Sequence, residues 1–469
     1  MNVTLSLTDK QHDQLTAHLF PGDGKEAVAF ALCGRRHGKG EQGLLVREIV
    51  TIPYHSCGVR TPECVNWSTS QMPELLSRAE RTGMAVMKIH SHPNGYPSFS
   101  RTDDKSDREF FSYLGIWLGD NSPHASLIML PDGKLIGRTI NQEGQFRPLA
   151  SIKWVGDDLK FWGCSHLDSN TIPEYGIRIA QAFGDGTYQL LRRLKIGVVG
   201  CSGTGSLVIE LLSRNCVGTL VLIDPERIEE KNLNRIPQAT MEDAKCRAFK
   251  VDVMARAIGE MGFGTKVETF ATDLYDPDAV RAVTACDIVF GCMDSIDGRH
   301  LLNRISSFYI LPYFDIGVRL IADGAGGVEQ VCGSVHYLKP GGSSLLSRGL
   351  YTLDQAHAAA LFSTDPVAYA EQVGDGYIEG VHEEKPAVMS VNMVYAALAV
   401  NELLARLHPY RLDPNAEYDR HTISLSHGIY EHAAHDVPCA LLSNHLGRGD
   451  VIPLLDMPAL SDKRKESVA

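Results

Sequence analysis

The sequence predicts an α/β protein with two domains, an N-terminal α+β domain followed by a doubly wound parallel sheet. At 469 residues the chain exceeds the size of one ordinary hydrophobic core. Short apolar runs mixed with helical periodicity occupy the first part, whereas strands alternate regularly with helix-length segments from residue 195 onwards. The expected divisions are a domain at 1–150, a linker with a first helix at 151–190, a second domain at 191–410 and a C-terminal extension at 411–469.

Apolar runs and helical spacings define the elements expected in the first domain. Short runs of apolar residues predict strands, and apolar residues recurring every three or four positions predict helices. The loop composition of WGCSHLDSNTIPEYG, residues 162–176, marks the join to the second domain. The expected strands are 27–33, 44–50, 84–89 and 125–130, and the expected helices are 72–82 and 103–118.

The second domain is predicted from five short apolar strands separated by helix-length segments. Such alternation calls for a Rossmann-like, doubly wound sheet. Gly, Ser and Asp are frequent over 337–386, which indicates a long, partly mobile insertion. A helix is expected within 386–409, and an irregular, His-rich tail after it. The five strands are KIGVVG, TLVLID, KVETFA, CDIVFG and YFDIG.

Composition narrows the classes of ligand. A formal charge of −12 disfavours nucleic acid, because binding to a phosphate backbone is driven by Lys and Arg. The sequence contains no run of about 18 apolar residues and no signal-peptide pattern, so we expect a cytoplasmic protein that does not bind or span a membrane. Its 11 cysteines occur without a CxxC pair, which argues against a zinc ribbon and against disulfides.

The stretch HSHPNGYPSFSRTD, residues 90–103, brings two histidines, a serine and an aspartate together. His90 and His92 lie on one face of a strand because side chains alternate with a period of two. With the carboxylate of Asp103 they make a three-ligand set for zinc that leaves a position for water. Ser100 would donate a hydrogen bond to an oxyanion. Taken separately, S-x-x-D is also a capping box, and an isolated H-x-H is more often a surface pair.

Together these residues read H-x-H-x7-S-x2-D, a string that resembles the JAMM (MPN) zinc metalloprotease family of deubiquitinases. The resemblance covers about residues 1–150. It implies hydrolysis of an amide or isopeptide bond after the C-terminal glycine of a ubiquitin-like protein. It also implies a glutamate base at the start of an early strand, where GKEAVAFALCG offers Glu26. Glu41 and Glu48 are the alternatives.

A glycine loop follows the first strand of the second domain. KIGVVGCSGTGS runs from strand to loop to helix and contains Gly200, Gly203 and Gly205. Such a loop lets the backbone approach phosphates, and the helix N-terminus beyond it favours negative charge. Asp224 ends the next strand, where a carboxylate binds ribose hydroxyls. The spacing G-x-x-G-x-G differs from the dinucleotide motif G-x-G-x-x-G, so a nicotinamide dehydrogenase is not expected.

Three charged stretches follow the loop: LIDPERIEEKNLNRIPQAT, KVDVMARAI and CDIVFGCMDSIDGRHLLN. Cations and an acid around phosphates suit adenylation, because charge builds up on the phosphoryl oxygens and on departing pyrophosphate. The stretches resemble the adenylyltransferase domain shared by ubiquitin-activating enzymes and the ThiF and MoeB sulfur-carrier activators.

That resemblance implies ATP and Mg²⁺ as cofactors and a homodimer as the assembly. Lys245 and Arg247 are the alternatives to Lys250 as the residue that neutralises charge. The implied roles are Asp224 on ribose, Asn232 and Arg235 on the phosphates, Lys250 neutralising charge, Asp294 positioning magnesium, and Arg178 reaching into the ATP site of a partner subunit.

The thiol that many relatives use is missing where it is expected. PGGSSLLSRG has Ser344 and Ser347 at positions where related chains have cysteines, and serine cannot perform the thioester step. Three interpretations stay open. The adenylate passes directly to an acceptor, another cysteine such as Cys332 or Cys439 forms the thioester, or the chain carries substitutions at the cysteine positions.

Both halves point to the flexible, glycine-terminated tail of a ubiquitin-like protein. We predict a bifunctional enzyme of a bacterial ubiquitin-like pathway that cleaves after this glycine and adenylates it for a conjugating enzyme. Resemblance to bacterial ubiquitin-like operons implies antiviral defence. The alternatives are sulfur-carrier processing and activation in cofactor or metabolite synthesis, and a binding module with one inactive half. Five histidines near the C-terminus are expected to be structural or solvated: His421, His427, His432, His435 and His445.

Overall fold

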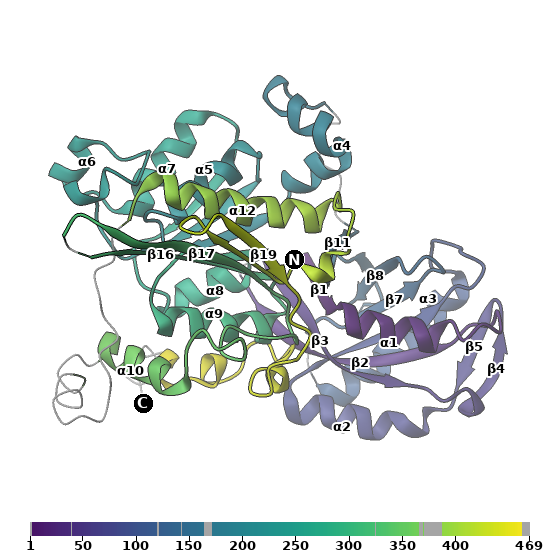
Figure 1. Ribbon diagram of the computed structural model, residues 1–469. Helices are drawn as coiled ribbons and strands as arrows, with labels where there is room; N and C mark the ends of the chain where they lie inside the picture. The colour runs from purple at the N-terminus through teal and green to yellow at the C-terminus, as the bar shows by residue number, and fades with distance from the viewer. Residues whose placement is uncertain are drawn as a thin grey trace. The chain divides into compact units, whose positions relative to one another are not determined.

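Two compact units make up the chain in the computed structural model (Figure 1). The first comprises Met1–His166, Phe308–Ile310 and Leu446–Ile452, and the second comprises Leu167–Ser307, Leu311–His445 and Pro453–Ala469. The structure describes residues 2–38, 40–119, 122–141, 143–163, 171–323, 325–364, 369 and 387–461.

A nine-stranded sheet forms the centre of the first unit, in the order β11-β10-β1-β3-β2-β6-β7-β8-β9. A separate hairpin contains β4 (Cys57–Thr61) and β5 (Cys64–Trp67). The strands of the main sheet are β1 Asn2–Thr8, β2 Val28–His37, β3 Glu41–Thr51, β6 Ala85–Ser91, β7 Ala125–Met129, β8 Leu135–Ile140, β9 Phe146–Pro148, β10 Ser151–Val155 and β11 Leu159–Trp162.

Helices cover both faces of this sheet. Alternate residues of β2 face opposite sides, as the period of a strand requires. Ala29 and Ala31 pack in the core that contains helix α1 (Asp9–Leu19), whereas Val28 and Phe30 pack in the core on the other side. That second core contains apolar residues of α2 (Met72–Thr82) and α3 (Arg101–Leu118).

The four strands and two helices predicted for the first domain are all present, but the sheet is larger than predicted. Residues 151–162, expected in the join, form β10 and β11 instead. β10 pairs in parallel with β1, so that Ile152 lies opposite Leu5. This pairing joins segments almost 150 residues apart, which a local sequence pattern does not show. The compact unit accordingly extends to His166.

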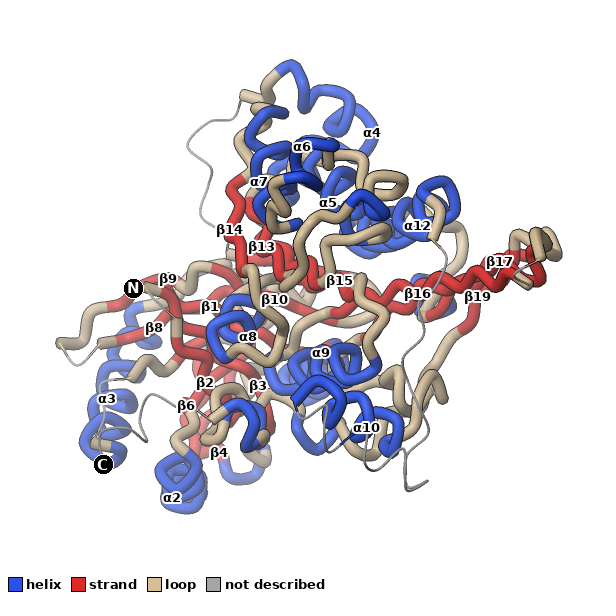
Figure 2. The backbone as a smooth tube through the Cα atoms, turned by 90° about the vertical axis from the view of Figure 1, so that its left-hand side faces the viewer, coloured by secondary structure: helices blue, strands red, loops and turns tan. Residues whose placement is uncertain are grey.

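An eight-stranded sheet forms the second unit, in the order β14-β13-β12-β15-β16-β17-β18-β19. Its first five strands are parallel, correspond to the five predicted runs and confirm the doubly wound fold class. Figure 2 shows the antiparallel extension that follows β16. The strands are β12 Lys195–Val199, β13 Thr219–Ile223, β14 Lys266–Phe270, β15 Ile288–Gly291, β16 Tyr313–Ala322, β17 Val328–Leu338, β18 Arg420–Ser424 and β19 Ile429–Ala433.

Helices also lie on both faces of the second sheet, with α5, α7 and α12 on one side and α8 and α9 on the other (Figure 1). The helix predicted within 386–409 is α12. Among the described residues, no helix combines the length and apolar character that crossing a bilayer requires. The helices are α4 Ile177–Leu191, α5 Gly205–Arg214, α6 Met241–Lys245, α7 Lys250–Met261, α8 Pro277–Thr284, α9 Ile296–Tyr309, α10 Leu353–Thr364 and α12 Met389–Leu407.

The segment after α12 differs from the irregular tail that was expected. It supplies β18 and β19, because β18 pairs with β17 across the sheet. Buried His421 of β18 contacts Glu402 of α12, with 2.6 Å between His421 Nε2 and Glu402 Oε2. Of the insertion expected at 337–386, residues 365–368 and 370–386 lie outside the described residues.

Candidate functional site

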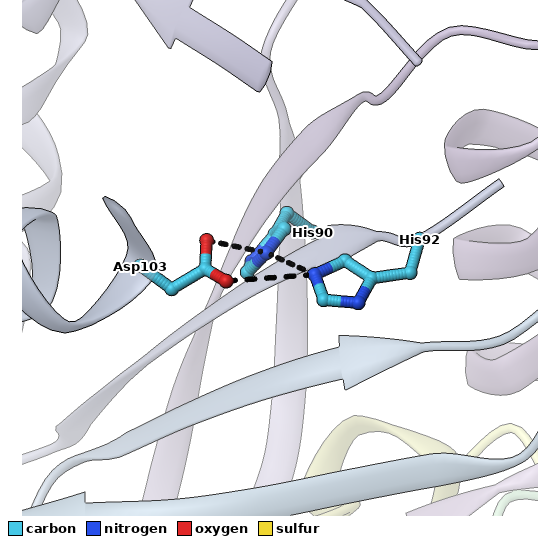
Figure 3. A group of neighbouring side chains, drawn as sticks. All are labelled: His90, His92 and Asp103. Atoms are coloured by element: carbon cyan, nitrogen blue, oxygen red, sulfur yellow. Dashed lines mark hydrogen bonds and ion pairs between the residues drawn. The ribbon is translucent and has the colours of Figure 1, made fainter. Parts of the chain in front are cut away.

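Three polar side chains converge where β6 ends and α3 begins (Figure 3). The Nε2 atoms of His90 and His92 lie 3.1 Å apart. Asp103 Oδ1 lies 3.1 Å from His90 Nε2, and Asp103 Oδ2 lies 3.6 Å from His92 Nε2. One ligand atom of each residue lies within 4.8 Å of the other two, so a single cation could contact all three.

Local structure explains how Asp103 reaches the histidines. Ser100 is the N-cap of α3, and its hydroxyl accepts the Asp103 N–H at 3.1 Å. In return Asp103 Oδ2 accepts the Ser100 N–H at 2.6 Å. The capping box and the His–Asp cluster therefore coexist, and the cap orients the carboxylate. The Ser100 hydroxyl acts as an acceptor here, which leaves its proton for another acceptor.

The donor set fits a divalent metal of the zinc type. His92 Nδ1 lies 2.8 Å from the Tyr96 carbonyl oxygen, to which it donates, so the neutral ring would present the lone pair of Nε2 to a metal. Burial lowers the pKa of His90, which favours the neutral form that binds metal. Burial would raise the pKa of Asp103, but hydrogen bonds with the two histidines hold it well below its usual range. Two imidazoles and a carboxylate are common zinc ligands.

Glu26 lies buried immediately before β2. Burial raises the pKa of its carboxyl to about 7, opposed by the charge of His92 and increased by that of Asp103. The β4–β5 hairpin holds its backbone: the Glu26 N–H donates to the Thr61 carbonyl, and Arg60 Nε donates to the Glu26 carbonyl, both at 2.9 Å. A carboxyl with a pKa near neutrality suits proton transfer at physiological pH.

The two alternative glutamates form ion pairs with arginines. Glu41 pairs with Arg36, and Glu48 pairs with Arg78. The charge of Glu26, in contrast, acts on His92 and raises the pKa of its imidazole. The geometry therefore favours Glu26 among the three candidate bases.

The glycine loop of the second unit is tightly folded. Gly200 adopts a φ of +90°, in the left-handed region that favours glycine. A Cβ at Gly205 would overlap the carbonyl oxygen of Gly200, and a Cβ at Gly203 would overlap the Asn392 amide. The three glycines thus allow close backbone approach at the start of α5, which is the arrangement that accommodates phosphates.

Asp224 connects this loop to the loop after β13. Its Oδ2 accepts the Cys201 N–H at 2.7 Å, and its Oδ1 accepts the Glu226 N–H at 2.8 Å. Burial raises the pKa of Asp224, and the charge of Lys250 opposes that rise. Buried Lys250 forms an ion pair with Glu226.

A cavity of about 1720 Å³ opens beside these loops. Lys250 and Gly205 are not in its lining, and Lys245 is exposed on α6 outside it. Arg247 does line the cavity. Arg178 lies apart on α4, where its Nη1 donates to Gln181 Oε1 at 2.9 Å. The predicted residues brought together in the lining are Gly200, Gly203, Asp224, Asn232, Arg235 and Asp294.

Comparison with known families accounts for both units. Residues 8–129 match the family described as prokaryotic homologs of the JAB domain. Residues 175–434, more than half of the chain, match the ThiF family. The chain belongs to the ThiF family. Both resemblances drawn from the sequence are thereby confirmed at the level of the family.

Individual relatives of this ThiF-family chain are distant. Ubiquitin-like modifier-activating enzyme 5 of Drosophila willistoni is 24% identical over 166 residues, 33% of this chain and 38% of the relative. The enzyme of the same name from Aedes aegypti is 25% identical over 163 residues, 33% of this chain and 39% of the relative. The chain thus spans about two fifths of the curated relatives' length.

The solved structures that resemble this chain also have low sequence identity to it. Escherichia coli MccB with ATP is 17% identical, with a TM-score of 0.43 over 58% of this chain and 75% of the other. PaaA is 16% identical, with a TM-score of 0.40 over 58% of this chain and 77% of the other.

The ThiF part contains a further polar group that sequence reasoning missed. Arg299 lines the cavity, and its Nε lies 3.2 Å from Oδ1 of fully buried Asp315. The Tyr313 hydroxyl donates to the same oxygen at 2.7 Å. His336 and Arg420 line the cavity from adjacent strands, where they lie opposite each other in register. An aspartate within the apolar run YFDIG is the signal that could have revealed this group.

Ser344 and Ser347, which the sequence resemblance placed where related chains have cysteines, hydrogen-bond to each other. The Ser344 N–H donates to Ser347 Oγ at 2.9 Å, and the Ser347 N–H donates to Ser344 Oγ at 3.2 Å. Neither serine lines the cavity. Of the thiols considered, Cys332 lines the cavity, whereas Cys439 is buried outside it.

Proposed function

We propose that this ThiF-family chain is an enzyme with two activities on one substrate. The first unit hydrolyses the bond after the C-terminal glycine of a ubiquitin-like protein, and the second adenylates the carboxylate exposed by that cleavage. The convergence of His90, His92 and Asp103 beside buried Glu26, in a chain with a ThiF glycine loop, carries this proposal.

In the first unit, His90, His92 and Asp103 would hold Zn²⁺. The bound metal would supply a Lewis acid that polarises the scissile carbonyl and makes water more acidic. Glu26 takes a proton from the attacking water and delivers it to the leaving amine. Ser100 donates a hydrogen bond from its hydroxyl to the developing oxyanion.

In the second unit, a carboxylate oxygen of the substrate attacks the α-phosphorus of ATP and pyrophosphate leaves. Asp224 orients ribose, Asn232 and Arg235 contact the phosphates, and Lys250 holds positive charge behind the loop. Asp294 would hold Mg²⁺, which offsets charge on the phosphate oxygens when bound. The glycine loop brings backbone N–H groups to the phosphates.

The acyl adenylate then passes directly to an acceptor, since Ser344 and Ser347 have no thiol with which to form a thioester. A ubiquitin-conjugating-like enzyme would take this role, and the setting would be a bacterial ubiquitin-like pathway, including antiviral defence. Cys332 is the alternative carrier because it lines the cavity. Arg178 would complete the ATP site of a second subunit in a homodimer.

The test is intact-mass spectrometry of a ubiquitin-like protein that is extended past its terminal glycine. We expect chelator-sensitive loss of the extension, followed in Mg-ATP by an AMP adduct on the shortened protein. An added mass on the enzyme that disappears in Cys332→Ala would identify a thioester instead. Unchanged substrate with zinc-loaded, ATP-binding protein would contradict the enzymatic proposal and favour a binding module.

A further inference from the structure

A buried ionic network lies one helical turn beyond the His–Asp cluster formed by His90, His92 and Asp103. Lys88 Nζ on β6 lies 2.8 Å from Asp107 Oδ1 on α3, and both side chains are buried. Arg138 of β8 donates through Nη2 to Asp107 Oδ2 at 2.7 Å. Its Nη1 donates to Asp104 Oδ1 at 2.5 Å. Two cations and two carboxylates therefore balance in charge.

The sheet register places these groups in one row under α3. Lys88 lies opposite Ser126 of β7, and Ser126 lies opposite Arg138 of β8. Phe30 of β2, opposite Lys88 on its other side, belongs to the apolar core beneath α2 and α3. The polar row thus interrupts an apolar layer. A buried ionic group is costly to desolvate, and apolar replacements are often as stable, so stability alone does not explain this network.

The spacing of the residues connects the network to the metal cluster. Lys88 and His90 lie two positions apart on a strand, which corresponds to about 6.6 Å along the strand. Asp107 and Asp103 are separated by four residues of a helix, about 6.0 Å, and lie on the same helix face. Strand and helix therefore form two matched rungs, His90 with Asp103 and Lys88 with Asp107.

The match restricts how α3 can lie on β6. A shift of the helix by one turn would move Asp103 toward Lys88 and leave His90 and His92 without a carboxylate. The same shift would separate Asp107 from both of its cations. Ionic groups are known to specify the register of packed elements in other systems.

We propose that Lys88, Asp107 and Arg138 are positioning residues for the metal centre. They hold α3 in the register that aims the Asp103 carboxylate at His90 and His92. This role rests on the proposed zinc site and deepens it. None of the three touches the metal, so their effect is on the geometry and affinity of the site.

The experiment measures zinc affinity in the full-length double variant Lys88→Met/Asp107→Leu by competition with a chromogenic chelator. The substitution removes both charges and keeps an apolar pair, and Arg138 retains Asp104. Zinc affinity is expected to fall by about 10–100-fold, the range for groups that orient metal ligands. The absorption spectrum of bound Co²⁺ is expected to change, which a loss of stability alone would not produce.

Two further variants keep the test decisive. Asp107→Asn is the substitute variant if the double variant fails to fold. It preserves the volume of the side chain and should also weaken zinc binding. Arg36→Met removes a similarly buried cation of the same unit, paired with Glu41 away from the cluster, and should leave zinc affinity unchanged. Wild-type zinc affinity in folded Lys88→Met/Asp107→Leu would overturn this inference and leave the metal centre intact. A wild-type protein that binds no zinc would overturn both.

Discussion

Asp103 takes part in two structures at once. One carboxylate oxygen accepts the Ser100 N–H in the cap of α3, and the other lies against His90. A residue in the first turn of the helix is therefore also a candidate metal ligand. The capping and metal interpretations of S-x-x-D describe two uses of one side chain, and the cap reduces the freedom that metal binding would otherwise have to remove.

Glu26→Gln tests the proposed proton transfer. The amide cannot take a proton from water, so cleavage is expected to slow by about 10²–10⁴-fold. Zinc content should not change, because Glu26 is not one of the ligands. Steady-state cleavage and metal analysis of the same preparation measure both. Glu48→Gln, in an exposed ion pair with Arg78, is the matched control and should cleave normally.

Gly205→Ala tests the glycine loop. The added methyl group would overlap the Gly200 carbonyl oxygen, so the loop must move away from its phosphate-binding form. ATP affinity, measured by calorimetry, is expected to fall by roughly tenfold or more, equivalent to about 1.4 kcal/mol.

Gly259→Ala provides the control within the same unit. A Cβ at Gly259 in α7 meets nothing within 4 Å. This substitution should leave ATP binding unchanged and raise the free energy of unfolding by about 0.5–1 kcal/mol through helix propensity. Equal ATP affinity in the two variants would contradict the role assigned to Gly205.

At the scale of elements, locally patterned segments could be predicted and long-range pairings could not. The parallel strands β12 to β16 follow from short apolar runs between helix-length segments. β10 and β18 belong to their sheets only because β1 and β17 offer an edge to pair with. Candidate ligands close in sequence, such as His90 and His92, were accessible to pattern reasoning. The Arg299–Asp315 pair was not, because different elements supply its members.

A buried ionic group joins α12 to β18 and predicts acid sensitivity. Burial would raise the pKa of Glu402, but the charge of Arg406, with hydrogen bonds from His421 and Arg411, lowers it to about 2. The folded-state pKa is below the ordinary value of 4.5. The stabilisation is therefore present above about pH 4.5 and is lost as the pH falls toward 2.

Glu402→Gln should lower the free energy of unfolding by about 3 kcal/mol at pH 7, because it removes the charged partner that lies 2.7 Å from Nε of buried Arg406. The difference from wild type should shrink below pH 4.5, as denaturant titrations at several pH values would show. Glu260→Gln, whose side chain is 72% exposed, is the control. A difference that does not vary with pH would contradict the assigned pKa.

At the scale of the whole molecule, the proposed metal centre and nucleotide site belong to separate compact units. His90→Ala is expected to abolish chelator-sensitive cleavage and, with a ubiquitin-like protein supplied already ending in its glycine, to leave ATP–pyrophosphate exchange intact. Lys250→Ala should do the reverse. Both assays on each full-length variant measure this separation. Loss of both activities in either variant, with unchanged thermal unfolding, would show that the two sites depend on each other.

The paired rungs between β6 and α3 also make the length of one helical turn part of the site. Each residue of an α-helix turns the chain by 100°. One amino acid inserted between Asp103 and Asp107 would leave Asp103 in place and turn Asp107 by about 100° away from Lys88 and Arg138. Natural length variation among related chains should therefore spare the first turn of the helix, whatever substitutions each position accepts.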